Sequence, residues 1–554
     1  MAHAKSIQTT MTFDTQINFL QLITFNYYCY PFIYYIKLQR IMETLHSHHE
    51  KRWMILGIMS LSLVIVMLNN ITLNVALPEL SLDLDADNTQ LQWILDAYAL
   101  TFGGTLLVMG ALGDRFGRRG ALQIGLVIVA LASGWTALFA DSATEVIAAR
   151  AVMGLGAALV MPATLSIVIV IFPKKERGKA IGIWAAMAGV GAPIGLLLGG
   201  YLVQNYDWQT VFLINVPIIT VALLLGMCFV PESKESASRP LDWTGSVLSI
   251  IALSSILYGI IEGPSLGWDS KEVIAAFSIG VIATITFIKW EHKTEHPILP
   301  MSFFSNKGYS VGLSAIALAF FVMFSFMFMQ MLHFQLVRGY SPLEAAVRFF
   351  PLPLGLMPAA ANSDKLVAKF GANRVVGSGL LLVTLALVIF SQVSMETPYY
   401  VLAIIFWFLG LGMGLTMAPS TTVVMDAIPE DKVGVGSATN DASREIGGAL
   451  GIAIGGSALN ELYQRNMIIP EGFVGPTEII YQSFPAAIRI GQKLKLQGNP
   501  VGDLLIDNAR LAFIDGMQAS SIIAGVIALS ASIFAFTKMP KKKHLLDGKA
   551  LEEE

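Results

Sequence analysis

The stretch Gly110-Ala111-Leu112-Gly113-Asp114-Arg115-Phe116-Gly117-Arg118-Arg119-Gly120 joins two long apolar segments of the chain. It contains one acid, three arginines and four glycines. Glycine permits a tight turn, and arginine is concentrated in the cytoplasmic loops between membrane spans. The stretch therefore predicts a short cytoplasmic connection between two transmembrane helices.

The composition extends this prediction to the whole chain. Of the 554 residues, 55% are hydrophobic and 14% are charged, and the mean hydropathy is +0.64. A soluble globular domain carries about 25% charged residues, so we expect an all-α polytopic membrane protein. The net charge of −3 forms no basic patch, which argues against nucleic acid as a partner.

The sequence lacks the motifs of enzymes and ATP-driven pumps. Its two cysteines, Cys29 and Cys228, lie in apolar segments and show neither metal-binding spacing nor a disulfide framework. There is no GxxxxGK[ST] run for phosphate binding. We therefore expect no enzyme activity, no metal and no cofactor.

A membrane span needs roughly 20 apolar residues. The apolar segments predict about fourteen spans, at residues 54–77, 91–112, 121–140, 146–171, 179–203, 210–230, 243–261, 272–289, 309–333, 342–362, 375–393, 399–425, 436–459 and 513–537. Alternate loops are rich in Lys and Arg, whereas the loop after the first span is acidic. The positive-inside rule then places both termini in the cytoplasm, and we expect the protein in the cell inner (cytoplasmic) membrane.

A weak internal repeat predicts how the spans are grouped. Lys369-Phe370-Gly371, followed by Arg374, is similar to Arg115-Phe116-Gly117, and the fifth and thirteenth predicted spans are both rich in glycine. An offset of eight spans fits two six-helix halves separated by two inserted helices, and repeats around a central site are typical of secondary transporters.

The expected domains follow from this repeat. They are a non-native or disordered leader at 1–41, with Met42 as the true start; an N-terminal six-helix bundle at 42–240; two inserted helices and a cytoplasmic linker at 241–308; a C-terminal six-helix bundle at 309–538; and a cytoplasmic tail at 539–554. The alternative for the leader is an extra helix. Two amphipathic stretches within 460–512 predict a helical hairpin lying on the outer face.

Five motifs occur in a fixed order along the chain. They are Asn74-Val75-Ala76-Leu77-Pro78, Trp93-Ile94-Leu95-Asp96-Ala97-Tyr98, the Arg-rich loop, Ala149-Arg150-Ala151-Val152-Met153-Gly154-Leu155-Gly156, and Phe212-Leu213-Ile214-Asn215-Val216-Pro217. Together they resemble the fourteen-helix drug:proton antiporters of the major facilitator superfamily, especially the quaternary-ammonium and multidrug exporters. The resemblance covers nearly all of the chain after Met42.

The resemblance implies a major facilitator fold and a function. The expected protein exports lipophilic, cationic small molecules in exchange for protons by alternating access, as a monomer in the lipid bilayer with the proton gradient as its energy source. Two alternatives remain open. One is an exporter of a specific metabolite, lipid, siderophore or amino acid; the other is a transport-inactive sensor or scaffold.

Asp96 is the first candidate for coupling transport to protons. It lies near the start of the second predicted span, where an ionised Asp costs a few kcal/mol. An acid retained there is expected to bind a proton or a cationic substrate. The resemblance supports this role, because quaternary-ammonium exporters carry an acid in the same Trp-x-x-Asp-x-Tyr setting. The alternative is an acid at the outer headgroups, in contact with water.

Asn69 departs from the family pattern. Many relatives have an Asp at this position of the first span, thought to take part in proton coupling, whereas Asn69 cannot titrate. Coupling is therefore expected at another acid, or the ions are handled differently. Arg150 matches a buried arginine of the family that modulates nearby protonation; its alternative is an arginine extending outward to the interface.

Further charged candidates lie in the later spans. Asp441 and Arg444 are three residues apart and can pair on one helix face, as a structural pair with a secondary role in the cytoplasmic gate. Asp426 is expected at the cytoplasmic interface, and is a weaker coupling candidate. Glu262 falls in an inserted helix and is expected to be loop-like.

The glycine-rich loop and helix have separate expected roles. Gly113, Asp114, Arg115, Gly117, Arg118 and Arg119 form the expected gating loop, in which Asp114 caps a helix end or pairs with basic groups; the alternative is that the arginines serve only topology. The expected helix-packing residues are Gly191, Pro193, Gly195, Gly199 and Gly200, because glycines four residues apart form a bare stripe. The family signature has Gly-Pro where this chain has Gly195-Leu196.

Aromatic and Met side chains gather in one late span. They are Phe320, Phe321, Phe324, Phe326, Phe328 and Met329. Such residues line hydrophobic drug cavities, but at this density they more often pack against neighbouring helices or face lipid. Packing or lipid contact is therefore favoured over a drug cavity.

Overall fold

The computed structural model describes residues 51–233, 242–295, 297–428 and 433–541. Within these ranges the chain forms helices joined by short loops, with no strand. The expected leader at 1–41 and its Met42 start lie outside the described residues, as does the cytoplasmic tail from residue 542 onward.

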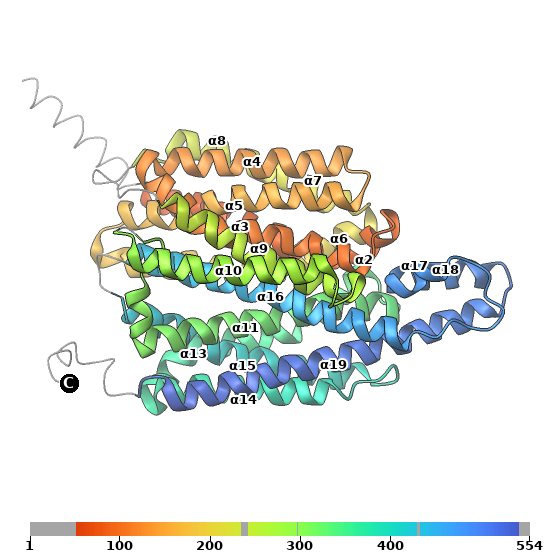
Figure 1. Ribbon diagram of the computed structural model, residues 1–554. Helices are drawn as coiled ribbons and strands as arrows, with labels where there is room; N and C mark the ends of the chain where they lie inside the picture. The colour runs from red at the N-terminus through yellow and green to blue at the C-terminus, as the bar shows by residue number, and fades with distance from the viewer. Residues whose placement is uncertain (1–50, 234–241, 296, 429–432, 542–554) are drawn as a thin grey trace, which may run out of the picture.

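The first half of the bundle, in red to yellow in Figure 1, precedes two inserted helices. Its helices are α2 (Arg52–Asp83), α3 (Asn88–Phe116), α4 (Arg118–Phe139), α5 (Ala143–Ile171), α6 (Lys174–Asn205), α7 (Gln209–Leu213) and α8 (Asn215–Phe229). The inserted helices are α9 (Trp243–Leu266) and α10 (Lys271–Lys293).

The second half, in green to blue, follows a short 3₁₀ turn, η1 (Met301–Ser305). Its elements are α11 (Lys307–Leu332), the π-helical turn η2 (His333–Val337), α12 (Pro342–Arg348), α13 (Pro351–Phe370), α14 (Ala372–Phe390), α15 (Tyr399–Asp426), α16 (Val433–Asn466), α17 (Thr477–Gln482), α18 (Phe484–Leu496) and α19 (Val501–Lys538).

The helices confirm a polytopic all-α membrane protein. Ten helices in the described ranges are long and apolar enough to cross a membrane. Four others, α3, α6, α13 and α16, coincide with predicted spans and run through the same bundle (Figure 1). The count of fourteen spans itself stays a prediction.

The two halves use the same helix pairs. In the first half α3 packs on α5, α4 on α5, α2 on α6 and α4 on α8. In the second half α13 packs on α15, α14 on α15, α11 on α16 and α14 on α19. When the spans are numbered along the chain, each second-half pair has the numbers of a first-half pair plus eight. The internal repeat of the sequence is therefore also a repeat of helix packing.

The turn between the second and third helices also recurs. Gly117 has φ +134° and its N–H donates to the carbonyl of Gly113. In the second half Gly371 has φ +91° and donates to Val367. A positive φ is readily adopted only by glycine, so each Arg- or Lys-rich turn depends on its glycine to join two helices without a loop.

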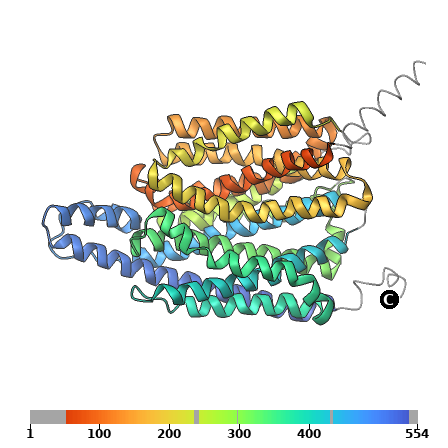
Figure 2. The same cartoon turned by 180° about the vertical axis from the view of Figure 1, so that it is seen from behind.

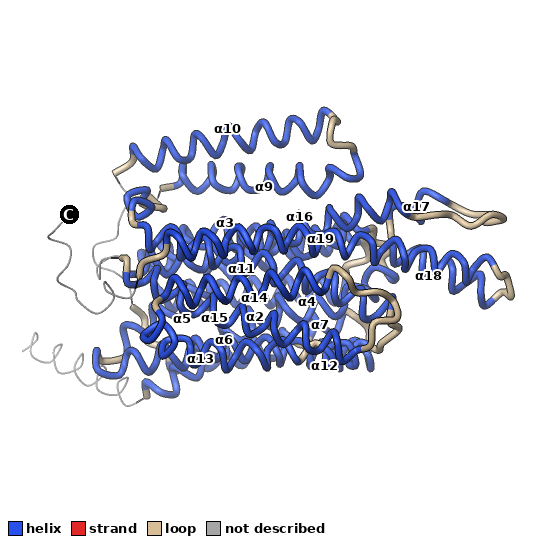
Figure 3. Tube along the Cα trace, turned by 90° about the horizontal axis from the view of Figure 1, so that it is seen from below, coloured by secondary structure: helices blue, strands red, loops and turns tan. Residues whose placement is uncertain are grey.

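The inserted helices lie along one flank of the bundle. Figure 3 shows α9 and α10 as a separate pair, with α9 nearer the bundle and α10 outermost. Helix α9 contacts α3 of the first half and α16 of the second. The insertion therefore covers the line along which these two helices meet.

The hairpin between α16 and α19 differs from the prediction in two ways. Its second arm is not a separate helix, because the chain is helical without a break from Val501 to Lys538. The hairpin also projects beyond the end of the bundle rather than lying flat on it (Figures 1 and 2). Helix α18 packs on the projecting part of α19, with Gly491 and Gly502 allowing their backbones to approach closely. We call the end with the hairpin the outer end, following the charge pattern of the loops.

Candidate functional site

Helix α3 of the first half packs antiparallel to α16 of the second half. We call this contact between the halves the seam. Helix α3 runs inward from its capping box, in which the Asp87 carboxylate accepts from the N–H of Gln90 at 2.7 Å. At the outer end Asn88 Nδ2 donates to Asn460 Oδ1 at 3.0 Å. Deeper in the molecule, a Cβ on Gly103 would lie 2.9 Å from the Cβ of Glu445. Because glycine has no side chain, Gly103 allows α3 and α16 to come into contact at this depth.

Asp96 is fully buried, and its spacing of eight residues from Asn88 places it on the seam face of α3. Neither of its carboxylate oxygens has a hydrogen-bond partner among the described residues. The alternative of an acid in contact with water at the headgroups is therefore wrong for this structure. A buried carboxyl without a partner is accommodated only when it is neutral or binds a cation.

Arg150, on α5, crosslinks three helices of the first half. Its Nε donates to the carbonyl of Ile94 at 3.0 Å, and its Nη1 lies 3.2 Å from the carbonyl and 3.4 Å from Oδ1 of Asn69. The guanidinium also lies over the ring of Tyr98, 4.2 Å from its centroid. With no exposed surface, Arg150 does not extend to the interface, so that alternative is wrong.

Glu445, on α16, is a buried acid that the sequence interpretation missed. Its side chain is 6% exposed and its Oε2 has no hydrogen-bond partner among the described residues. It lies within electrostatic range of Arg150 and Tyr98 from the first half and of Asp441 and Arg444 on its own helix. The available signal was the spacing of Asp441 and Glu445, four residues apart on one helix face.

The structure thus places one unpaired acid from each half on the same seam. Asp96 comes from α3 and Glu445 from α16, with Glu445 farther than Asp96 from the outer end of the bundle. Arg150 and Glu445 attract each other across the boundary between the halves. A charge change at Glu445 therefore acts on the contact between the halves.

The remaining charged candidates lie away from these two acids or support them. Arg444 pairs with Asp441 at 3.2 Å, as the spacing predicted, and Arg444 Nη2 lies 3.4 Å from Thr421 Oγ1 on α15. Asp426 is exposed at the last residue of α15, in agreement with an interfacial position. Glu262 lies within α9, not in a loop, and accepts from Trp93 Nε1 at 3.0 Å.

The Arg-rich turn is tied to the chain that follows α8. Arg119 donates from Nη1 to the Val230 carbonyl at 3.3 Å and lies 3.5 Å from the Glu232 carboxylate. The N–H of Arg118 donates to the Ser233 carbonyl at 2.9 Å. These arginines therefore make specific contacts within the first half. The side chain of Asp114 lies outside the described part of the structure, and Arg115 lies over the ring of Phe116.

The glycine stripe of α6 faces α2. Cβ atoms on Gly191, Gly195 and Gly199 would meet Met67, Leu68 and Thr72, respectively. Pro193 is part of the same unbroken helix. Gly200 differs from the stripe, because a Cβ there would lie 2.8 Å from Leu343 Cα in the other half. It therefore packs α6 against α12 at the outer end.

The aromatic cluster of α11 serves mainly as core. Phe321, Phe324, Phe328 and Met329 are buried, and Phe326 packs on the rings of Phe349, Phe390 and Phe406 of the same half. Phe320 is half-buried beside Arg444. These contacts agree with the packing interpretation for Phe326.

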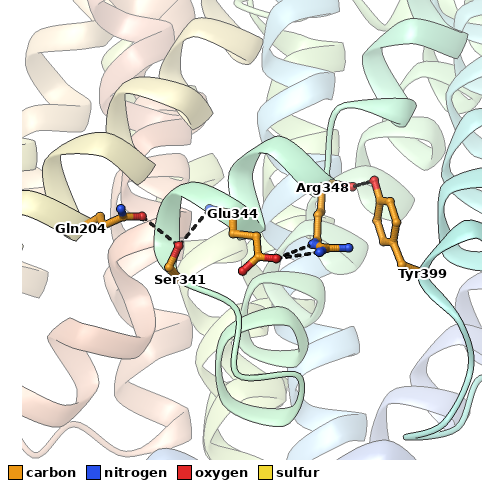
Figure 4. Close-up of polar contacts among 5 residues, drawn as sticks. All are labelled: Gln204, Ser341, Glu344, Arg348 and Tyr399. Carbon is orange, nitrogen blue, oxygen red and sulfur yellow. Dashed lines mark hydrogen bonds and ion pairs between the residues drawn. The ribbon is translucent and has the colours of Figure 1, made fainter.

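The outer ends of the halves are joined at several further points. Figure 4 shows one of them, where Ser341 at the start of α12 donates to Gln204 of α6 at 2.8 Å and caps α12 by accepting from the N–H of Glu344. Gln335 of η2 donates to the Val75 carbonyl of α2 at 2.8 Å. The hairpin adds an ion pair between Arg489 and Asp85 at 2.6 Å. The outer end is therefore closed.

Comparison with known proteins assigns the fold to a family. The profile of the Major Facilitator Superfamily matches residues 59–452. The chain is 30% identical over 484 residues to the multidrug efflux pump LfrA of Mycolicibacterium smegmatis, covering 87% of this chain and 95% of that protein. It is 29% identical to the methyl viologen resistance protein SmvA of Salmonella typhimurium, covering 89% and 99% of the two chains.

Solved structures agree on the fold. A bacterial homologue of the human lysosomal transporter Spinster, in an inward-facing and unoccupied conformation, superposes with a TM-score of 0.61 at 17% identity. The alignment covers 88% of this chain and 98% of that one. A peptide transporter in complex with sulfate superposes with a TM-score of 0.57 at 15% identity, over 88% and 95% of the two chains.

Proposed function

The chain belongs to the major facilitator superfamily, and from this premise we propose that it exports lipophilic cationic compounds in exchange for protons. The observation that carries the proposal is the pair of buried, unpaired acids, Asp96 and Glu445, at the seam between the two halves. The similarity to multidrug efflux and methyl viologen resistance proteins supports a cationic drug as the substrate class.

Asp96 alternates between a proton and the substrate in this mechanism. With the outer end closed, a lipophilic cation from the cytoplasm replaces the proton at the buried carboxyl, which removes the cost of an isolated buried charge. Rocking of the halves then opens the outer end. Protonation from outside releases the cation, and the protonated carboxyl allows the outer end to close again.

Glu445 and Arg150 couple the charge at the seam to the contact between halves. A charged Glu445 is stabilised by the guanidinium of Arg150 in the facing half, whereas a protonated Glu445 loses this attraction. Protonation of Glu445 therefore weakens the inner part of the seam. Two acids at different depths let opposite openings of the transporter exchange protons with opposite sides of the membrane.

The proposal is tested in everted membrane vesicles with a preformed proton gradient and a quenched pH dye. Mono- and divalent lipophilic cations are added to vesicles carrying the wild type, Asp96→Asn, Glu445→Gln or Asp426→Asn. We expect the wild type and Asp426→Asn to dissipate the gradient, and both seam variants to lose at least 90% of that response. A wild type that dissipates the gradient with none of the cations would contradict proton-coupled export.

A further inference from the structure

We propose that the outer half of the α3–α16 seam is the route by which external protons reach Asp96, with Gln92 as its polar step and α9 as its seal against lipid. This inference rests on the proposed function, since it names the path of the proton that drives export. It gives the inserted helices, which lie outside both six-helix halves, a defined task.

The seam is a ladder of facing polar residues. On α3, Asn88, Gln92 and Asp96 are four residues apart and so lie on one helix face, each step rising about 6 Å. On α16 the facing residues run in the opposite order: Asn460 bonds Asn88 at 3.0 Å, and Ser457 Oγ lies 3.5 Å from Gln92 Oε1. The ladder leads from the outer end down to Asp96.

Each level of the ladder has unused hydrogen-bonding capacity. Asn460 Nδ2, Gln92 Nε2 and both oxygens of Asp96 are buried and have no partner among the described residues. Buried polar groups are normally satisfied by protein or by ordered water. The levels are close enough for water to connect them, and hydrogen-bonded water between amide groups and a carboxyl is a path for protons.

The side chain of Gln92 fits between the helices because α16 has a glycine, Gly456, beside it. A Cβ on Gly456 would lie 2.7 Å from the Gln92 Cδ. Ser457 in turn donates to the Ile260 carbonyl of α9 at 2.7 Å. The Gln92 amide is therefore held between α3, α16 and α9 without having its own N–H groups bonded.

Helix α9 closes the side of the ladder that would otherwise face lipid. It is joined to α3 in an antiparallel register, by Thr89 with Ser265 at 3.0 Å and by Trp93 with Glu262 at 3.0 Å. These contacts lie beside the same levels as Asn88 and Gln92. Lipid tails would leave the polar ladder unsatisfied at several kcal/mol per group, so a covering helix is physically required here.

Below Asp96 the seam becomes apolar. Ala99 and Leu100 of α3 and Ala449 of α16, which follow inward of Asp96, belong to one buried hydrophobic cluster. This cluster separates Asp96 from Glu445 farther in. The outer ladder therefore ends at Asp96, which keeps external protons away from the inner acid.

The charged groups around the ladder fit an entry for cations. Asp87 precedes α3, Glu262 lies on α9 and Glu461 on α16, all near the outer mouth. Farther in, Glu445 of α16 lies beside Gly103, and at the level of Asp96 the guanidinium of Arg150 donates to the Ile94 carbonyl. Three acids at the mouth attract protons, whereas the guanidinium of Arg150 is turned toward Asn69 and Tyr98.

In the described residues, the second seam between the halves is built differently where α6 meets α12. There Gly200 lies beside Leu343, with Ser341 and Gln204 at the outermost level. The inserted helices lie on the other flank, against α3 and α16. The cover is thus placed on the seam that contains Asp96.

The test compares two transport modes of the full chain in proteoliposomes. Exchange of labelled ethidium for unlabelled ethidium moves only substrate, whereas efflux driven by a pH gradient also needs the proton path. For Gln92→Leu we expect exchange within twofold of the wild type and gradient-driven efflux lowered at least tenfold. The conservative variant Gln92→Glu keeps a polar group at this level and should recover efflux to within threefold.

A matched control is Gln518→Leu, which removes a partly buried glutamine on α19 whose one hydrogen bond among the described residues goes to the Val393 carbonyl of its own half. It should leave both modes within twofold of the wild type. Unchanged gradient-driven efflux in Gln92→Leu overturns the inference. Loss of exchange together with efflux also overturns it, because Gln92 would then be needed for the change between the two conformations of the transporter. If the wild type exchanges ethidium but shows no gradient-driven efflux, the proposed function fails instead.

Discussion

The contacts of Arg150 show how an asparagine can occupy the position of an acid in the first span. Asn69 offers two oxygen acceptors, its carbonyl and its amide Oδ1, to the same guanidinium nitrogen. Its Nδ2 lies 3.5 Å from Met153 Sδ. An amide therefore satisfies the arginine without adding a charge, and the electrostatic attraction of Arg150 remains available to Glu445.

The first residue-scale prediction concerns Arg150→Lys. Lysine keeps the positive charge but cannot reach Ile94 and Asn69 with a planar fork of donors or stack on Tyr98 in the same way. We expect a loss of about 2 kcal/mol in the free energy of unfolding, visible as a lower melting temperature in detergent. The exposed Arg489→Lys is the control and should melt within a degree or two, because exposed ion pairs contribute about 0–1 kcal/mol. Equal melting of both variants would contradict the buried network.

Asp87, the N-cap of α3, lies outside the membrane-spanning segments and is the subject of a second residue-scale prediction. Burial raises the pKa of its carboxyl, while hydrogen bonds from Gln90 and Thr89 oppose the rise. A carboxyl with a raised folded pKa costs stability as the pH rises above its unfolded value near 3.9. Asparagine caps a helix about as well as aspartate and carries no charge.

Asp87→Asn should therefore match or exceed the wild type in melting temperature at pH 7, with the advantage shrinking toward pH 4. Asp87→Ala removes the cap and should lose about 0.5–2 kcal/mol at both pH values. Melting curves at the two pH values measure both effects. An Asn variant as unstable as the Ala variant would show that the charge, not the cap, is what α3 needs.

Glycine acts at the scale of whole elements in this protein. The stripe on α6 brings the backbone of α2 close: at Gly199 an added Cβ would lie 2.7 Å from Thr72 Cγ2 and 2.9 Å from the Thr72 carbonyl oxygen. The backbone oxygen cannot move aside as a flexible side chain can. Small residues of this kind are the usual basis of tight helix pairs in membranes.

The element-scale prediction compares two glycine-to-alanine changes inside helices. Gly199→Ala should lower the free energy of unfolding by about 1–3 kcal/mol, because it separates α2 from α6. Gly226→Ala on α8 meets no atom within 4 Å and should be neutral or stabilising by about 0.5–1 kcal/mol, since alanine favours the helix. Chemical unfolding in mild detergent compares the two; equal effects would mean that the stripe does not fix the helix distance.

At the scale of the whole molecule, the closed outer end defines the conformation. The halves are joined there by the pairs Asn88–Asn460, Val75–Gln335 and Gln204–Ser341. Each is a hydrogen bond of modest net strength, about 0.5–1.5 kcal/mol. Together they are strong enough to hold one state and weak enough to be broken once per transport cycle.

The whole-molecule prediction uses this closure. Gln204→Cys combined with Ser341→Cys, in a chain lacking Cys29 and Cys228, places two thiols across the second seam. A short cleavable thiol crosslinker should abolish export, and reduction should restore it. Each single variant, treated in the same way, serves as the control. Full export after complete crosslinking would show that the outer end need not open.

The sequence predicted the helices well because apolar runs, basic loops and turn glycines are local signals. The turn at Gly117 and its copy at Gly371 share a basic residue, a phenylalanine and a glycine in sequence, and both glycines have a positive φ. The sequence also singled out Asp96 and Arg150, since a charge inside an apolar run stands out wherever the helix packs. It failed for Glu445, which lies beside Asp441 and Arg444 in a span with several polar residues.

Local sequence signals suffice to specify a bundle of membrane-crossing helices with a repeated half, because burial in lipid constrains composition residue by residue. Which polar groups meet, in contrast, depends on how the helices pack. The register that sets Asn88 against Asn460 and Gly103 against Glu445 joins segments far apart in the chain, and no local pattern encodes it. The placement of α9 over that seam depends on packing against two helices at once, so it emerges only when both halves have come together.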